Sequence, residues 1–150
     1  MNNIIEVKDK FVATIDNLLI LNKEFRQVIN PATRQIASPA EYAFEFCTVA
    51  CDVGRRIGKS HYIQQHADDT SLVVVATERH RLLVEARGFD VLTAEQVEAD
   101  DFDDKVLGKK IYKTIFVDEP SLVFKKIDRH DFYFKLARSG EDQTFILLGT

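Results

Sequence analysis

Short apolar runs recur along this chain and limit the folds that it can adopt. The runs occupy residues 44–53, 72–76, 90–93, 114–118 and 144–148. Nearly continuous apolar runs of this length are typical of strands that are buried on both faces of a sheet. The segments between them have helical patterns, and strands that alternate with helices form parallel sheets. We therefore expect an α/β fold with three layers, αβα, around a mainly parallel central sheet.

Helices are expected on both sides of the first run and between the later ones. Residues 11–29 have the apolar spacing of an amphipathic helix, which Asn30-Pro31 would end. A second helix is expected to start at Ser38-Pro39, because a serine cap and a proline suit the first helical turn.

Two further helices and one loop are expected in the second half of the chain. Residues 78–87 are predicted to form a helix that Gly88 ends, and residues 121–137 are predicted to be mainly helical. The acidic stretch 98–104 predicts a solvated loop.

Composition sets the class of protein. A chain of 150 residues, 45% hydrophobic and 29% charged, is typical of one soluble domain. We expect a single domain over residues 1–150, with residues 1–40 as an N-terminal helical extension. No signal peptide is recognisable, and no stretch approaches the roughly 18 apolar residues of a membrane helix. The sequence therefore predicts a cytoplasmic protein that does not bind membranes.

Charge and cysteine content exclude two further classes. The net charge of −4 argues against a general nucleic-acid coat, which would be basic throughout, but leaves room for a local basic face. Cys47 and Cys51 are the only cysteines, and no further ligands at matching spacing suggest zinc. We expect both to be buried as small apolar side chains.

Residues 54–60 join the first apolar run to an expected helix. Their sequence, Gly-Arg-Arg-Ile-Gly-Lys-Ser, matches the end of the phosphate-loop pattern G-x-x-x-x-G-K-[ST], although Val53 stands where the pattern has its first glycine. Glycines let backbone N–H groups approach phosphate oxygens, and the helix N-terminus adds the positive end of its dipole. Lys59 would reach the β- and γ-phosphates, and the Ser60 hydroxyl would bind Mg²⁺. The expected nucleotide-binding residues are Gly54, Arg55, Arg56, Ile57, Gly58, Lys59, Ser60 and His61.

A second polar motif follows the run 114–118. This run ends in Asp118 and is followed by Glu119, which is the form of a Walker B motif. Asp118 would hold Mg²⁺, and Glu119 would act as the general base that polarises the attacking water. Ligands of open α/β sheets bind at the carboxyl ends of strands, so both motifs are expected to meet there. ATP is the expected substrate and Mg²⁺ the expected cofactor.

These two motifs carry a resemblance to a known family. The loop at 54–60 resembles the deviant Walker A motif of viral large-terminase ATPases, which typically reads small residue-Arg-Gln-x-Gly-Lys-[Ser/Thr]. Asp118-Glu119 is similar to the Walker B pair of terminases and related helicases, in the additional-strand, catalytic-glutamate group of P-loop ATPases. The resemblance spans roughly residues 44–150. It implies a minimal RecA-like P-loop NTPase core. Because no residues remain for the nuclease domain of terminases, we expect a stand-alone, phage-encoded ATPase in the host cytoplasm.

The resemblance also assigns a role to the loop arginines. Arg55 matches the terminase loop arginine that is proposed to stabilise transition-state charge on the γ-phosphate, which would make it catalytic together with Lys59 and Glu119. Arg56 stands where the family often has glutamine. Solvent exposure or partner binding is the alternative for both arginines.

Two further pairs of residues take their roles from the family. Gly149 and Thr150 fall where the strand after Walker B ends in a short polar coupling motif. Arg79 and Arg81 follow the run 72–76, where helicases and terminases place a nucleic-acid contact. The alternative for these two arginines is a polar helix start.

The leading functional hypothesis is a Mg²⁺-dependent ATPase of the terminase/helicase type that acts on nucleic acid, DNA more than RNA. It would work alone, as a homo-oligomer, or with a partner subunit in a phage nucleoprotein assembly. A small nucleoside or nucleotide kinase is the first alternative, because Asp-Glu after a strand can serve a hydroxyl acceptor. A non-catalytic nucleotide-binding regulatory module is the second, because Val53 replaces a loop glycine.

Overall fold

The computed structural model describes residues 4–54, 58–84, 88–99, 110–138 and 142–150. Its strands are β1 (Thr48–Cys51), β2 (Ser71–Val75), β3 (Asp90–Thr93), β4 (Thr114–Asp118) and β5 (Thr144–Leu148). Its helices are α1 (Ile4–Val28), α2 (Pro31–Ile36), α3 (Pro39–Phe46), α4 (Lys59–His66), α5 (Glu78–Leu83), α6 (Ala94–Ala99), α8 (Pro120–Val123) and α9 (Arg129–Leu136). None of the helices in these described ranges is long and apolar enough to cross a membrane.

The five strands form one sheet, and every pair of neighbours in it is parallel. The strand order is β1-β5-β4-β2-β3, so β5 lies between the first strand and β4. The side chains of β2 are all buried, as the continuous apolar run of this segment predicts. The sheet is therefore parallel throughout, where the sequence predicted a mainly parallel one.

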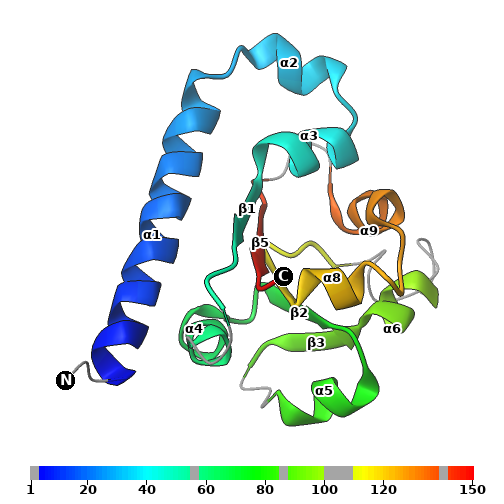
Figure 1. Ribbon diagram of the computed structural model, residues 1–150. Coiled ribbons are helices and arrows are strands. Elements are labelled where there is room, and N and C mark those ends of the chain that lie inside the picture. Colours follow the sequence, from blue (N-terminus) through cyan, green and yellow to red (C-terminus); the bar gives the residue numbers. More distant parts are fainter. Residues whose placement is uncertain (1–3, 55–57, 85–87, 100–109, 139–141) are drawn as a thin grey trace.

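Helices cover both faces of the sheet (Figure 1). On one face, Phe11 and Ile15 of α1 and Tyr62 and Ile63 of α4 pack on side chains of β2, β4 and β5. On the other face, buried side chains of α3, α6, α8 and α9 pack on alternate residues of the same strands. The predicted α/β fold with three layers, αβα, is confirmed.

The N-terminal helix begins earlier than residue 11, where the sequence predicted its start, and it is tied to the core by polar contacts. Tyr62 in α4 donates a hydrogen bond from its hydroxyl to Asp16 Oδ1 at 3.1 Å. Arg26 donates to Asp142 Oδ1 at 3.0 Å and to the Gln143 carbonyl at 3.1 Å. These contacts hold α1 beside α4 and against the segment that leads into β5.

Part of the predicted first strand is wrong. The sequence predicted a strand over residues 44–53, but 44–46 belong to α3 and β1 contains only Thr48–Cys51. Ser38 caps α3 by accepting from the Glu41 N–H at 3.2 Å, and Ala40 and Ala43 bury one face of the helix. The apolar run thus combines the end of a helix with a short strand. Both Cys47 and Cys51 are buried and free, as predicted.

Two of the predicted helices end or break early. The helix predicted over 78–87 ends at Leu83, because Val84 is extended; residues 85–87 lie outside the described residues. The helix predicted over 121–137 is divided into α8 and α9. Asp128 starts the second of these by accepting from the N–H groups of His130 and Asp131 at 2.9 and 3.3 Å.

The predicted acidic loop is also partly wrong. Its first residues, Glu98 and Ala99, lie in α6, while residues 100–104 lie outside the described residues. The cause is a capping box before α6: the Thr93 N–H donates to Gln96 Oε1 at 2.8 Å, and the Gln96 N–H donates to Thr93 Oγ1 at 3.1 Å. This reciprocal pair satisfies two backbone donors and starts a helix where charge alone predicts a loop.

Candidate functional site

The carboxyl ends of β1, β5 and β4 lie level with one another. Cys51 of β1 and Asp118 of β4 both pair with Leu148 of β5, the strand that lies between them. The segments that follow these strands therefore leave the sheet at the same edge. They carry the predicted phosphate loop, Glu119, and Gly149 with Thr150.

The described part of the phosphate loop ends in α4, which begins at Lys59. Gly54 and Gly58 both have positive φ angles, +105° and +112°, which glycine adopts most readily. A side chain at Gly58 would also meet Lys8 of α1, whose Cγ is 3.2 Å from the position of a Cβ atom. The Lys8 side chain of the N-terminal helix therefore packs against Gly58. Ser60 and His61 are exposed in the first turn of α4, and Arg55, Arg56 and Ile57 lie outside the described residues.

Lys59 and Glu119 form an ion pair across the sheet edge. Lys59 Nζ contacts Glu119 Oε1, and the Thr150 hydroxyl donates to Glu119 Oε2 at 3.3 Å. The Lys59 side chain is only 12% exposed and that of Glu119 is 25% exposed, so solvent screens this pair less than a surface pair. The two predicted motifs thus supply one cation and one carboxylate that touch each other.

The backbone at this edge holds unusual conformations. Glu119 has φ of +58°, and it is the only non-glycine residue in the described ranges with a positive φ. Its N–H donates to the Leu148 carbonyl at 3.0 Å, and its carbonyl accepts from the Leu122 N–H at 3.0 Å. Such a conformation costs about 1–3 kcal/mol and tends to occur at functional sites.

Gly149 is required beside this ion pair for two reasons. Its φ is +108°, which disfavours any residue with a side chain. A Cβ atom there would lie 2.8 Å from Glu119 Oε2 and 3.0 Å from Lys59 Nζ. The glycine thus leaves the room that the two charged side chains occupy.

Asp118 makes a second charged contact, which the sequence did not predict. Its side chain is 5% exposed, and its Oδ2 lies 3.0 Å from Nε2 of His80, in the first turn of α5. The hydrogen bond to Asp118 raises the pKa of His80, and the charges of Asp118 and Glu119 add to this effect, while burial and Lys59 oppose it. The contact arises because β2, which precedes His80, pairs with β4.

Four side chains therefore form one charged cluster, which we call the charged edge. They are Lys59, His80, Asp118 and Glu119. Two basic groups face two carboxylates, so each carboxylate has a basic partner at short range. Within the ranges that the structure describes, no group of three or more His, Cys, Asp or Glu side chains is arranged to hold a metal ion by itself. Any metal here would take its remaining ligands from hydroxyls, water or a phosphate.

The predicted nucleic-acid contacts lie beside the charged edge. Arg79 is exposed at the start of α5. Arg81 contacts Glu78 of the same helix, with Nε at 2.8 Å from Oε2. This exposed pair within one helix contributes little stability, and it leaves the arginine near the surface.

A hollow of about 350 Å³ opens next to the charged edge, beyond the ends of β2 and β3. Its lining is Ala76, Thr77, Glu78, Thr93, Glu95, Gln96, Ala99 and Lys126. Most of the lining surface is apolar, and Thr77, Glu78 and Glu95 bring a hydroxyl and two carboxylates to it. It belongs to the same turn as His80, because Thr77 caps α5 by accepting from the His80 N–H at 3.1 Å.

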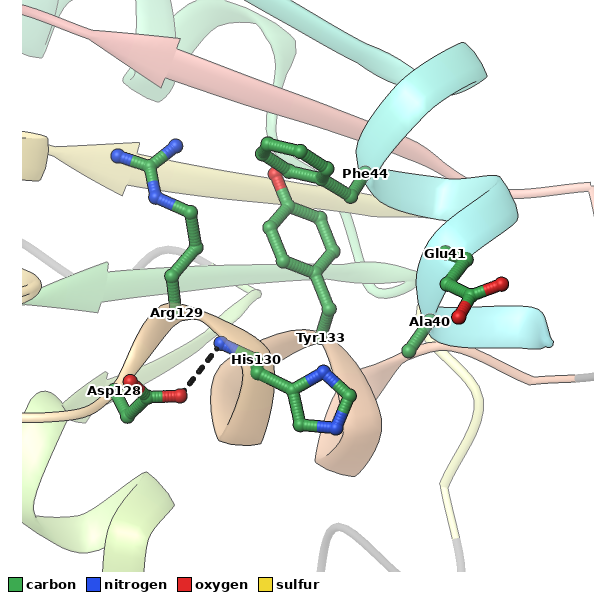
Figure 2. A pocket seen from close by; sticks show the side chains of 7 residues that line it. All are labelled: Ala40, Glu41, Phe44, Asp128, Arg129, His130 and Tyr133. Atoms are coloured by element: carbon green, nitrogen blue, oxygen red, sulfur yellow. Dashed lines mark hydrogen bonds between the residues drawn. The ribbon is translucent and has the colours of Figure 1, made fainter. Parts of the chain in front are cut away.

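A second hollow, of about 310 Å³, lies between α3 and α9 (Figure 2). We call it the aromatic hollow; its lining is Ala40, Glu41, Phe44, Asp128, Arg129, His130 and Tyr133. Phe44 packs edge-on against Tyr133, with ring centroids 5.5 Å apart. The guanidinium of Arg129 lies 4.3 Å from the centroid of Phe124 and 5.8 Å from that of Phe44. This hollow holds none of the predicted site residues.

Comparison of the chain with protein-family models, curated proteins and solved structures found no match. The case for a function therefore depends on the geometry of the charged edge.

Proposed function

We propose that the chain binds ATP with Mg²⁺ at the charged edge and hydrolyses it, as a P-loop ATPase of the terminase/helicase type. The observation that carries this proposal is the contact between Lys59 and Glu119. These residues belong to a Gly-Lys-Ser loop and an Asp-Glu strand end that lie far apart in the sequence. Chemistry on a triphosphate needs a phosphate-binding lysine and a general base at one place, and the fold brings such a pair together.

The topology of the sheet supports the same proposal. The resemblance implies a strand after the Asp-Glu motif that ends in a polar coupling motif. Here β5 follows β4 and lies between β4 and β1. Beyond its end, the Thr150 hydroxyl donates to Glu119 Oε2 at 3.3 Å. Thr150 is thus in contact with the proposed base, as a coupling residue would need to be.

The available donors fit Mg²⁺. Asp118 is a buried carboxylate, and Ser60 presents an exposed hydroxyl in the first turn of α4. Oxygen ligands of this kind, completed by phosphate oxygens and water, are the ones Mg²⁺ prefers. Asp118 and Ser60 would hold the ion, which supplies positive charge that neutralises the phosphate oxygens.

The ion pair between Lys59 and Glu119 gives the nucleotide-free protein a defined resting arrangement. In this arrangement the ammonium group of Lys59 contacts Oε1 of Glu119, the proposed base. A triphosphate would attract Lys59 more strongly than one carboxylate does, because it carries several negative charges. The departure of Lys59 frees Glu119 to orient the attacking water and to accept its proton.

Nucleic acid is the proposed partner of this ATPase, DNA more than RNA. Arg79 and Arg81 stand at the start of α5, in the same turn as His80 of the charged edge. Phosphate contacts from arginine position a protein on nucleic acid without reading its sequence. Nucleic acid bound to these arginines would lie next to His80 and could therefore change the geometry of the charged edge, where the nucleotide would bind.

A hydrolysis assay tests the proposal. ATP and GTP would be offered with and without single- and double-stranded DNA and RNA to the wild type, Lys59→Ala and Glu119→Gln. We expect Lys59→Ala to lose nucleotide binding, and Glu119→Gln to keep binding while turnover falls by about 10²–10⁴-fold. Lys125→Ala, at an exposed position in the turn after α8, and Glu45→Gln, at an exposed position of α3, serve as controls of matched chemistry. Wild-type turnover in Glu119→Gln would remove the base assignment, and a wild type that binds no nucleotide would end the proposal.

The hollow lined by Thr77, Glu78 and Glu95 favours a second candidate function, a small nucleoside or nucleotide kinase. A mostly apolar lining with a few hydroxyl and carboxylate groups suits an acceptor that has an apolar ring and polar substituents. A panel of nucleosides and nucleotides in a coupled assay separates the two functions. Phosphoryl transfer to any member of the panel would replace the ATPase proposal.

A further inference from the structure

His80 has no part in the function proposed above, although it touches a central residue of the site. Its Nε2 lies 3.0 Å from Asp118 Oδ2. The histidine side chain is 27% exposed, whereas that of Asp118 is 5% exposed. The one strong contact of this buried carboxylate that the structure shows is therefore with an imidazole nitrogen.

The separation of these two atoms suits a shared metal ion. A divalent ion holds an imidazole nitrogen and a carboxylate oxygen at about 2.0–2.2 Å each. Two ligands at such distances and at right angles to each other are about 3.0 Å apart. His80 Nε2 and Asp118 Oδ2 already have this separation, so little movement of either side chain is needed.

The local structure keeps the imidazole at this place. The Thr77 hydroxyl accepts from the His80 N–H at 3.1 Å and fixes the first turn of α5. The preceding strand, β2, pairs with β4 up to Val74 opposite Val117, one residue before Asp118. Both residues are thus attached to neighbouring strands of the rigid sheet, which is the support that a metal ligand needs.

We propose that His80 Nε2 is a direct ligand, beside Asp118 Oδ2, of the divalent cation at the charged edge. The site then has mixed nitrogen and oxygen ligands, and it binds an ion that accepts imidazole, such as Co²⁺ or Zn²⁺, more tightly than it binds Mg²⁺. This inference rests on the metal site of the proposed function. It adds the identity of one ligand and the ion preference that follows from it.

The test is a metal titration of the full chain with Co²⁺ alone and with Mg²⁺ alone, by calorimetry and by the visible absorption of Co²⁺. The variants are His80→Gln, which keeps a polar side chain without imidazole, and His130→Gln, at an exposed histidine on α9. We expect His80→Gln to lower Co²⁺ affinity about tenfold or more and to alter the Co²⁺ spectrum. Its Mg²⁺ affinity should change by less than about threefold, since oxygen ligands remain. His130→Gln should match the wild type in both titrations.

Asp118→Asn separates failure of this inference from failure of the proposed function. If Asp118→Asn loses Mg²⁺ and Co²⁺ binding while His80→Gln changes neither, His80 is not a ligand but the metal site stands. If Asp118→Asn binds both ions as the wild type does, the metal site itself is wrong, and the inference is overturned with it.

A measurement on the wild type makes the test independent of variant folding. Mn²⁺ broadens the NMR signals of nearby nuclei, and the chain has four histidines for comparison. We expect the ring signals of His80 to broaden at the lowest Mn²⁺ concentration. Equal broadening of all the histidines, or earlier broadening of another one, would overturn the inference.

Discussion

The charged edge and the aromatic hollow contain the same kinds of ionisable residue and use them differently. The edge has Lys59, His80, Asp118 and Glu119, and the hollow has Arg129, His130, Asp128 and Glu41. At the edge, each carboxylate faces a basic side chain from another element. In the hollow, the Asp128 carboxylate accepts from N–H groups of its own helix, and the Arg129 guanidinium lies over aromatic rings. The comparison shows that the two regions differ in the partners of these residues more than in the residue types.

The backbone conformation also differs between the two regions: it is strained at the charged edge and regular at the aromatic hollow. Glu119 and Gly149 at the edge have positive φ angles, and a Cβ atom at Gly149 would collide with the side chains of Glu119 and Lys59. The hollow is formed by regular helices with favourable caps, Ser38 for α3 and Asp128 for α9. Strain at the edge is offset by the stability of the packed helices and sheet elsewhere. Substitutions at the aromatic hollow should therefore lower mainly the stability of the fold, and substitutions at the charged edge should lower mainly the proposed activity.

The largest effect on stability is expected in the hollow. Tyr133 is buried, and its ring packs against Phe145 at 4.8 Å between centroids. Tyr133→Ala should lower the free energy of unfolding by about 3–5 kcal/mol, as for other buried aromatic residues. Urea denaturation measures this loss. Nucleotide affinity of the protein that remains folded should be unchanged, and a loss of affinity there would show that the two regions are coupled.

A smaller effect on stability, with a large effect on activity, is expected at the edge. Gly149→Ala places a methyl group 2.8 Å from Glu119 Oε2 at a φ of +108°. The free energy of unfolding should fall by about 1–3 kcal/mol, and the ion pair between Lys59 and Glu119 should be displaced. Urea denaturation and the hydrolysis assay measure the two effects. Gly88→Ala is the control, because its φ is also positive but a Cβ atom there meets nothing within 4 Å. Equal loss of turnover in both variants would contradict the steric explanation.

The two aspartates give a direct contrast. Asp128→Ala removes a helix cap and should lower the free energy of unfolding by about 0.5–2 kcal/mol, with metal affinity unchanged. Asp118→Ala should instead abolish metal binding at the charged edge. Denaturation and Mg²⁺ titration of both variants check this contrast. Loss of metal binding in Asp128→Ala would mean that the hollow belongs to the site.

The smallest effect is a pH dependence that belongs to the hollow. Burial raises the pKa of Tyr133 above its ordinary value of 10.0. The neutral phenol is thus favoured in the folded state, and its stabilising effect is complete below pH 10 and lost as the pH rises through the folded pKa. Tyr133→Phe removes the hydrogen bond between the phenol and Thr48 and also removes this titration. The stability difference between wild type and Tyr133→Phe, measured by denaturation, should narrow at alkaline pH. A stability difference that stays constant with pH would contradict the raised pKa of Tyr133.

Much of the fold could be predicted because apolar runs mark buried strands directly. β3, β4 and β5 have their predicted bounds, and β2 is shifted by one residue from its prediction. The boundary between α3 and β1 could not be placed, because Phe44 and Phe46 are as apolar as the strand that follows. The start of α6 could have been found from Thr93 and Gln96, whose spacing is that of a capping box.

The sequence predicted some residues of the candidate site and missed one. Lys59 and Glu119 stand in local motifs, and their meeting follows from the rule that ligands bind at the carboxyl ends of parallel strands. His80 could not be predicted, because its contact with Asp118 depends on β2 lying beside β4. Strand order is a property of the folded sheet, and the alternation of strands and helices does not determine it.

The place of β5 between β1 and β4 has a consequence for the order in which the molecule can form. β5 pairs with β1 on one side and with β4 on the other, although it follows the other four strands of the sheet in the sequence. During synthesis, β2, β3 and β4 can associate first, while β1 and the loop after it have no neighbouring strand. The ribosome must release residues 144–148 before Lys59 and Glu119 are held on one continuous sheet. A nascent chain that has not reached this point can bury part of its core but has no completed site.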